Sequence, residues 1–75
     1  MSKITAGIII IGDEILYGRT RETNSNFMAK ELVRAGIKLN EIRVIEDNCK
    51  NIIKTVQEFH KAYTYVFTTG GIGPT

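Results

Sequence analysis

Residues Ile4 to Ile11 read ITAGIIII, a nearly continuous apolar run that closes on four consecutive isoleucines. β-Branched side chains of this kind favour a β-strand. The run does not alternate with polar residues, as a strand with one face in water would. The pattern therefore predicts a strand that is buried on both faces, as in a parallel sheet. Gly12 ends the predicted strand.

The sequence after this strand predicts a loop and then an amphipathic helix. Residues 13–22 carry Gly18 and several charges, a composition typical of a loop. Each residue from 23 to 25 has a side chain that can cap a helix. Gly36 supplies the helix stop. The apolar stripe expected on this helix consists of Met28, Ala29, Leu32, Val33 and Ala35.

A second strand, a second helix and a third strand follow. Residues 37–45 mix apolar with charged side chains, which predicts an edge strand. Asp47 and Asn48 are turn and cap residues, and residues 65–69 form the third predicted strand. The apolar stripe of the helix between them consists of Ile52, Ile53, Val56, Phe59, His60 and Tyr63.

The order strand, helix, strand, helix, strand predicts an α/β fold of parallel strands joined by right-handed crossovers. The first strand is the most apolar and should lie in the centre, which gives the spatial order 2-1-3. We therefore expect a three-layer α/β/α arrangement around a partial doubly wound sheet. Sheets in such proteins usually have about five strands. Residues 1–75 are accordingly expected to form the N-terminal half of a larger domain.

Composition narrows the class of protein. The net charge of +2 comes from scattered basic residues, which indicates solvated helix faces rather than a nucleic-acid site. A single cysteine, Cys49, excludes an internal disulfide and fits a reducing compartment. The sequence shows neither a signal peptide nor an apolar segment near the roughly 20 residues of a membrane span. We therefore expect a cytoplasmic protein without membrane or nucleic-acid partners.

Three loops should meet at the carboxyl edge of the sheet, where ligands bind in open α/β sheets. They are residues 12–14 (GDE), 46–48 (EDN) and 69–75 (TGGIGPT). Glycines let backbone N–H groups approach a phosphate, and Mg²⁺ is typically held by one or two carboxylates with phosphate oxygens. The sequence thus predicts a small phosphorylated ligand, with Asp13 and Glu14 at the metal. The predicted binding residues are Gly12, Asp13, Glu14, Thr69, Gly70, Gly71, Gly73 and Thr75.

Each of these segments has a plainer interpretation, and no catalytic residue is assigned. Gly-Asp-Glu after a strand is often only a turn, and an Asp-Asn pair more often caps a helix than binds a ligand. The glycine stretch matches neither the G-x-G-x-x-G fingerprint nor the P-loop pattern.

The motifs taken together resemble the molybdopterin-binding domain family. The resemblance rests on residues 11–18 (IGDEILYG), 23–24, 35–37, 47–48 and 69–75, and is closest to the branch at the N-terminus of competence/damage-inducible protein A. A similar domain occurs in FAD synthases. The resemblance implies an α/β/α sandwich that forms oligomers and binds molybdopterin or its adenylylated form at the carboxyl strand ends. In the competence-protein branch it implies divalent-metal-dependent hydrolysis of ADP-ribose-like pyrophosphates.

Three functions remain open. The first is a module that binds a pterin or a nucleotide. The second is a metal-dependent ADP-ribose-type pyrophosphatase, for which the family continues beyond Thr75 with an acidic segment that supplies aspartates. The third is an inactive truncated remnant, or one half of a split protein that needs a second half. We rank ligand binding first, with a homo-oligomer or a missing second half as the protein partner.

Overall fold

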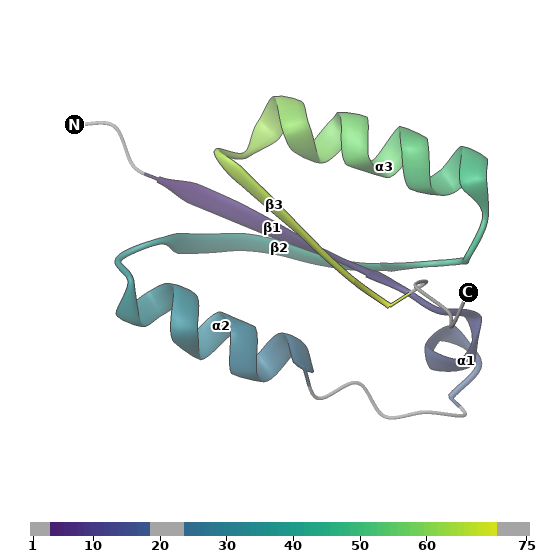
Figure 1. Ribbon diagram of the computed structural model, residues 1–75, viewed down its shortest axis with the longest axis horizontal. Coiled ribbons are helices and arrows are strands. Elements are labelled where there is room, and N and C mark those ends of the chain that lie inside the picture. Colours follow the sequence, from purple (N-terminus) through teal and green to yellow (C-terminus); the bar gives the residue numbers. More distant parts are fainter. Residues whose placement is uncertain (1–3, 19–23, 71–75) are drawn as a thin grey trace.

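A computed structural model describes residues 4–18 and 24–70 (Figure 1). Three parallel strands form one sheet in the order β2-β1-β3, and α3 and α2 lie on opposite faces of it. The predicted fold class and strand order are therefore confirmed. In chain order the elements are β1 (Thr5–Ile11), α1 (Asp13–Leu16), α2 (Asn24–Arg34), β2 (Lys38–Ile45), α3 (Cys49–Ala62) and β3 (Tyr65–Gly70).

Strand β1 fills the centre of the molecule, as its apolar run predicts. Ala6, Ile8 and Ile10 pack with Leu32 of α2 on one face. Ile9 and Ile11 pack with Phe59 of α3 on the other. Because a helix covers each face, both sets of β1 side chains are buried and no polar alternation is needed.

At Gly7, side chains from the end of α3 come very close to the backbone of β1. A Cβ atom there would lie 2.4 Å from a ring carbon of Phe59 and 2.7 Å from one of Tyr63. A glycine inside a strand commonly marks such a close approach. Gly7 therefore lets the rings of Phe59 in α3 and of Tyr63 just after it pack directly on the backbone of β1.

Strand β2 carries an irregularity that decides where its polar side chains point. Its register with β1 shifts between Ala6 and Gly7, whose partners are Leu39 and Glu41. Leu39 packs with the α2 face, whereas Glu41 bonds to Tyr63 at the end of α3. The shift thus turns the second half of this edge strand so that Glu41 faces α3.

The helix ends follow the predicted signals. Gly36 has a φ of +79°, and Ile37 N donates to Leu32 O at 2.9 Å, which closes the end of α2. Asn48 caps α3, since its side chain accepts hydrogen bonds from Lys50 N and Asn51 N. Residue 23, one of the predicted caps of α2, lies outside the described residues.

Three details of the sequence prediction were wrong. Residues 13–16 form the helical turn α1 instead of a loop: Tyr17 N donates to Asp13 O at 3.0 Å, and Ile15 packs against the core. In α2, Val33 is 70% exposed, and Ala35 lies beyond the helix and is exposed. In α3, Ile53 is 58% exposed. Each helix rests on the sheet along one narrow line, so residues beside that line stay in solvent.

Candidate functional site

All three strands end level with one another at the carboxyl edge of the sheet. Ile11 of β1 is the register partner of both Ile45 of β2 and Gly70 of β3. Thr69 is likewise the partner of Ile10. Gly12, which follows β1, donates its N–H to Ile45 O at 3.1 Å. The structure therefore brings residues 12–14 to the same edge as Thr69 and Gly70.

Asp13 connects α1 to the loop between β2 and α3. Its Oδ1 atom accepts a hydrogen bond from Asp47 N at 3.0 Å. Asn48 N in turn donates to Glu46 O at 2.9 Å, and the Asn48 side chain caps α3. Asp13 thus fixes a loop whose other end begins α3. The plainer interpretation of Asn48 as a cap is confirmed.

Glu14 and Gly12 lie against each other at the end of β1. Gly12 is buried, and its φ of 169° is extended backbone that any residue adopts. A Cβ atom at residue 12 would lie 2.9 Å from Oε1 of Glu14. Glycine at this position therefore provides space beside the Glu14 carboxylate rather than an unusual backbone conformation.

The remaining predicted binding residues lie on the β3 side of this edge. Thr69 is half-buried in β3, and Gly70 is the last residue of that strand. Gly71, Gly73 and Thr75 lie outside the described residues. Within residues 4–18 and 24–70, no group of three His, Cys, Asp or Glu side chains is arranged to hold a metal ion.

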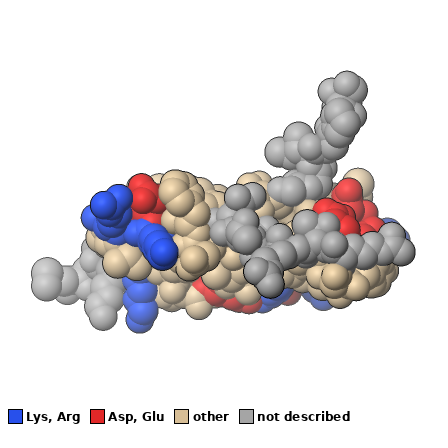
Figure 2. All heavy atoms as spheres, turned by 90° about the horizontal axis from the view of Figure 1, so that it is seen from below, with Lys and Arg blue, Asp and Glu red and all other residues tan. Residues whose placement is uncertain are grey.

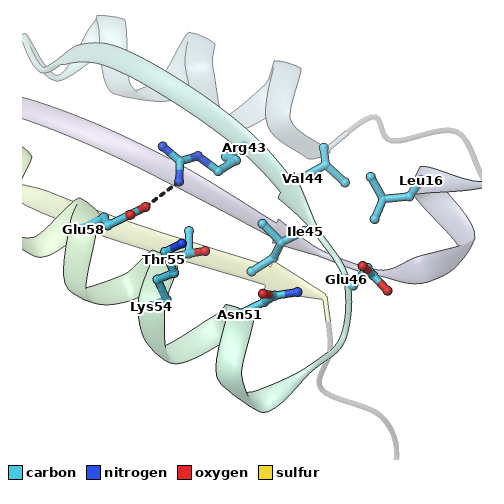
Figure 3. A pocket seen from close by; sticks show the side chains of 9 residues that line it. All are labelled: Leu16, Arg43, Val44, Ile45, Glu46, Asn51, Lys54, Thr55 and Glu58. Carbon is cyan, nitrogen blue, oxygen red and sulfur yellow. Dashed lines mark hydrogen bonds and ion pairs between the residues drawn. The ribbon is translucent and has the colours of Figure 1, made fainter.

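A shallow hollow of about 310 Å³ lies between β2 and α3, away from β3 (Figure 3). None of the predicted binding residues lines it, and nothing in the sequence pattern located it. Its polar wall includes Arg43 and Glu58, which form an ion pair at 2.8 Å. The lining residues are Leu16, Arg43, Val44, Ile45, Glu46, Asn51, Lys54, Thr55 and Glu58.

A polar network surrounds Arg43 beside this hollow. Arg43 also pairs with Glu41 at 2.7 Å and lies 5.0 Å above the centre of the Phe59 ring. The Tyr63 hydroxyl donates to Glu41. This hydrogen bond, and then the Arg43 guanidinium, lower the pKa of Glu41, and the same bond raises the pKa of Tyr63. The bonds join β2 to α3, so the network holds the helix on the edge strand.

The α2 side of the molecule carries no single large charged patch among its described residues. Figure 2 shows basic side chains, with an acidic one among them, toward one end, and acidic side chains toward the end where the strands finish.

A mainly apolar hollow of about 610 Å³ lies on α2 and includes Phe27 and Val33 in its lining. Among the described helices, none combines the length and the apolar character needed to cross a membrane.

Comparison with known proteins shows the family to which the chain belongs. Residues 7–75 match the family described as a probable molybdopterin binding domain. The sequence is 51% identical over 71 residues to a protein named probable FAD synthase from Caenorhabditis elegans. It is 42% identical over 72 residues to a CinA-like protein from Cytophaga hutchinsonii. These alignments cover 95% and 96% of this chain.

The fold agrees with a solved relative. The crystal structure of the protein CinA, of unknown function, from Thermoplasma acidophilum matches with a TM-score of 0.90 and 32% sequence identity. The match covers 97% of this chain and 43% of that one.

The sheet, its two covering helices and the level strand ends define an α/β protein of the open-sheet class. The chain belongs to the molybdopterin-binding domain family. It is similar to relatives named CinA-like and competence-damage inducible protein. It spans only 14% and 17% of the length of the FAD synthase and CinA-like relatives.

Proposed function

We propose that the chain binds the phosphate-bearing part of a pterin such as molybdopterin, or of a nucleotide, at the carboxyl edge of the sheet. The observation that carries this proposal is the level ending of the strands at Ile11, Ile45 and Gly70. It brings an acidic turn and the start of a glycine-rich segment to one edge. Membership of the molybdopterin-binding domain family supports the same conclusion. We place this function in the cytoplasm, since the chain has one cysteine and it is exposed.

Each predicted residue has a role in this proposal. The backbone N–H groups of Gly70, Gly71 and Gly73 approach the phosphate, because glycine has no side chain to keep it away. The hydroxyls of Thr69 and Thr75 donate further hydrogen bonds. Gly12, Asp13 and Glu14 form the opposite wall. The carboxylates of Asp13 and Glu14 would repel an anionic ligand, so a cation such as Mg²⁺ is expected between carboxylates and phosphate.

Calorimetric titration with ADP-ribose and with a molybdopterin analogue, each with and without Mg²⁺, tests the proposal. Gly71→Val should weaken binding at least about tenfold, because its side chain fills the space that a phosphate needs. Ala35→Val adds similar bulk at an exposed position away from this edge and should bind as the original chain does. Equal affinities for the two variants would place the binding site elsewhere.

A metal-dependent pyrophosphatase is the second candidate, favoured by the acidic turn at the same edge. We expect binding without appreciable turnover, because no described cluster of three ligands surrounds the cation. Incubation of the chain with ADP-ribose and Mg²⁺, followed by chromatography of the nucleotide products, measures this. Rapid Mg²⁺-dependent release of AMP would make the enzyme the better proposal.

We also propose a protein partner at β3, either a second copy of the chain or a second half that completes the sheet. In the described part of the chain β3 pairs only with β1, and Tyr65 on it is 48% exposed. An unpaired strand edge readily adds another strand. Analytical ultracentrifugation over a range of concentrations tests self-association. A monomer at every concentration would leave a separate second half as the partner to seek.

A further inference from the structure

The outer side of α2 carries a line of exposed side chains that the sheet does not use. Phe27 on this side is 67% exposed. Positions three, four and seven residues further along a helix lie on the same side as the first. In α2 they are occupied by Lys30, Glu31 and Arg34, all of which are exposed. The mainly apolar hollow of about 610 Å³ includes all four residues in its lining, and together they are the α2 stripe.

The α2 stripe is separate from the two surfaces already described. Helix α2 packs on the core through Met28 and Leu32 and contacts β2. Strand β1 lies between β2 and β3, so the stripe is away from the free edge of β3. No residue of the stripe belongs to the loops at the carboxyl edge. The Phe27 ring and the apolar stems of Lys30 and Arg34 form a strip with charges along it, which suits contact with another protein surface.

The order of the charges in the α2 stripe favours a second copy of the chain that runs in the opposite direction. Two antiparallel α2 helices, related by a two-fold axis between positions 30 and 31, place Lys30 against the partner's Glu31. The same axis places the Phe27 ring against the partner's Arg34, and a guanidinium over an aromatic ring is favourable. Each contact occurs twice because the axis is two-fold. A parallel pair would instead set Lys30 against Lys30 and Glu31 against Glu31.

The charged groups of the stripe are available for such contacts. Lys30 makes no hydrogen bond or ion pair with another residue of the described segments. Glu31 pairs with Arg34 at 3.3 Å, and their side chains are 50% and 80% exposed. An ion pair this exposed contributes little to stability. Both side chains can therefore turn to a partner without loss of the fold.

We propose that α2 is the contact surface of a homodimer in which two α2 stripes pack antiparallel about a two-fold axis. The helix has 11 residues and is therefore about 16 Å long. Its contact area is below the roughly 1,200–2,000 Å² of a stable interface, so the dimer should be weak, with a Kd above about 10 µM. This contact depends neither on the proposed ligand nor on the partner at β3.

Reversal of single charges tests the pairing. Analytical ultracentrifugation of the full chain, from about 10 µM to about 1 mM, measures the Kd of the dimer. Lys30→Glu and Glu31→Lys should each weaken it at least about tenfold, because each sets like charges against one another across the axis. An equimolar mixture of the two variants should associate within about threefold of the original chain, since opposite charges then face each other again.

Lys50→Glu is the matched control, because it reverses the charge of an exposed lysine on α3, which lies on the opposite face of the sheet. It should leave the Kd unchanged, and circular dichroism checks the helix content of every variant.

Three results would overturn the inference. A monomer at every concentration would mean that a second copy does not cover the stripe. A Kd that does not respond to Lys30→Glu would place self-association on another surface, such as β3. A mixture that associates as weakly as the separate variants would exclude the antiparallel pairing. Ligand titration decides the proposed function independently of all three.

Discussion

The two helices that cover the sheet are attached to it to different degrees. Helix α3 buries Phe59 and Thr55, begins at a capped end and is bonded to β2 through Arg43. Helix α2 buries Leu32, while Phe27 and Val33 are 67% and 70% exposed. Both sequences carry a helical apolar stripe. The comparison shows that a stripe predicts a helix but does not predict how much of it the sheet will bury.

The strand between the helices accounts for much of the difference. On the α3 face β1 presents Gly7, so the rings of Phe59 and Tyr63 pack on its backbone. The two rings also contact each other edge to face, with centres 5.2 Å apart. On the α2 face β1 presents Ala6, Ile8 and Ile10, against which Leu32 packs. The face with the glycine thus accepts the larger side chains.

The largest difference should be that between the two helix phenylalanines, Phe59 of α3 and Phe27 of α2. Phe59 is 1% exposed, so Phe59→Ala should lower the free energy of unfolding by about 3–5 kcal/mol and leave much of this small chain unfolded. Phe27→Ala, the matched change on α2, should alter it by less than about 0.5 kcal/mol because the ring is exposed. Urea unfolding followed by circular dichroism measures both. Equal losses would mean that α2 is attached as firmly as α3.

A methyl group at Gly7 tests the close approach from the strand side. Gly7→Ala should lower the free energy of unfolding by about 1–3 kcal/mol, because the new Cβ atom overlaps both rings of α3. The same urea titration measures it. Combining Gly7→Ala with Phe59→Leu, which removes the ring, should recover part of the loss. No recovery would show that the strain arises in the backbone of β1 instead.

The cap of α3 should contribute less. Asn48→Ala removes the acceptor for Lys50 N and Asn51 N and should lower the free energy of unfolding by about 1 kcal/mol. Asn48→Asp keeps an acceptor and serves as the control. If Asn48→Asp lowers the free energy of unfolding as much as Asn48→Ala, the stabilisation comes from the amide group of Asn48 and not from its role as a cap acceptor.

The smallest effect concerns the polar network on the α3 side. Tyr63, and then Arg43, lower the pKa of Glu41 from its ordinary value of 4.5. The stability that Glu41 contributes is therefore complete above pH 4.5 and is lost as the pH falls through its lower value in the folded chain. Because these groups are partly in solvent, the contribution should be under about 1 kcal/mol.

Unfolding of the chain and of Glu41→Gln across acidic pH measures this contribution. The two curves should differ near neutrality and converge as the pH falls through the lowered pKa of Glu41, where the original carboxylate also becomes neutral. The pKa of Tyr63 is raised above its ordinary value of 10, so its contribution should persist below pH 10 and be lost as the pH rises through the higher value. A constant difference across acidic pH would exclude the charge of Glu41 as the cause.

Much of the candidate site follows from the sequence, because parallel strands bring their carboxyl ends to one edge. This reasoning correctly predicts that residues 12–14 lie at the same edge of the sheet as Thr69 and Gly70. It does not predict the hydrogen bond from Asp47 N to Asp13, because local sequence does not specify a contact across 34 positions. The helical turn at residues 13–16 was also missed, because charged residues and glycine are common in loops.

Local patterns in the sequence are enough to predict the strand order, both long helices, the end of α2 and the start of α3. The unbroken run before Gly12, the polarity of residues 38–45, and the signals at Gly36 and Asn48 are local, and local patterns suffice for these features. Which apolar residues are buried depends on the surface that faces each helix, and therefore follows from the packing of the elements and not from local patterns. The register shift after Leu39, which turns Glu41 toward Tyr63, likewise depends on how β2 pairs with β1, a contact between segments far apart in the chain.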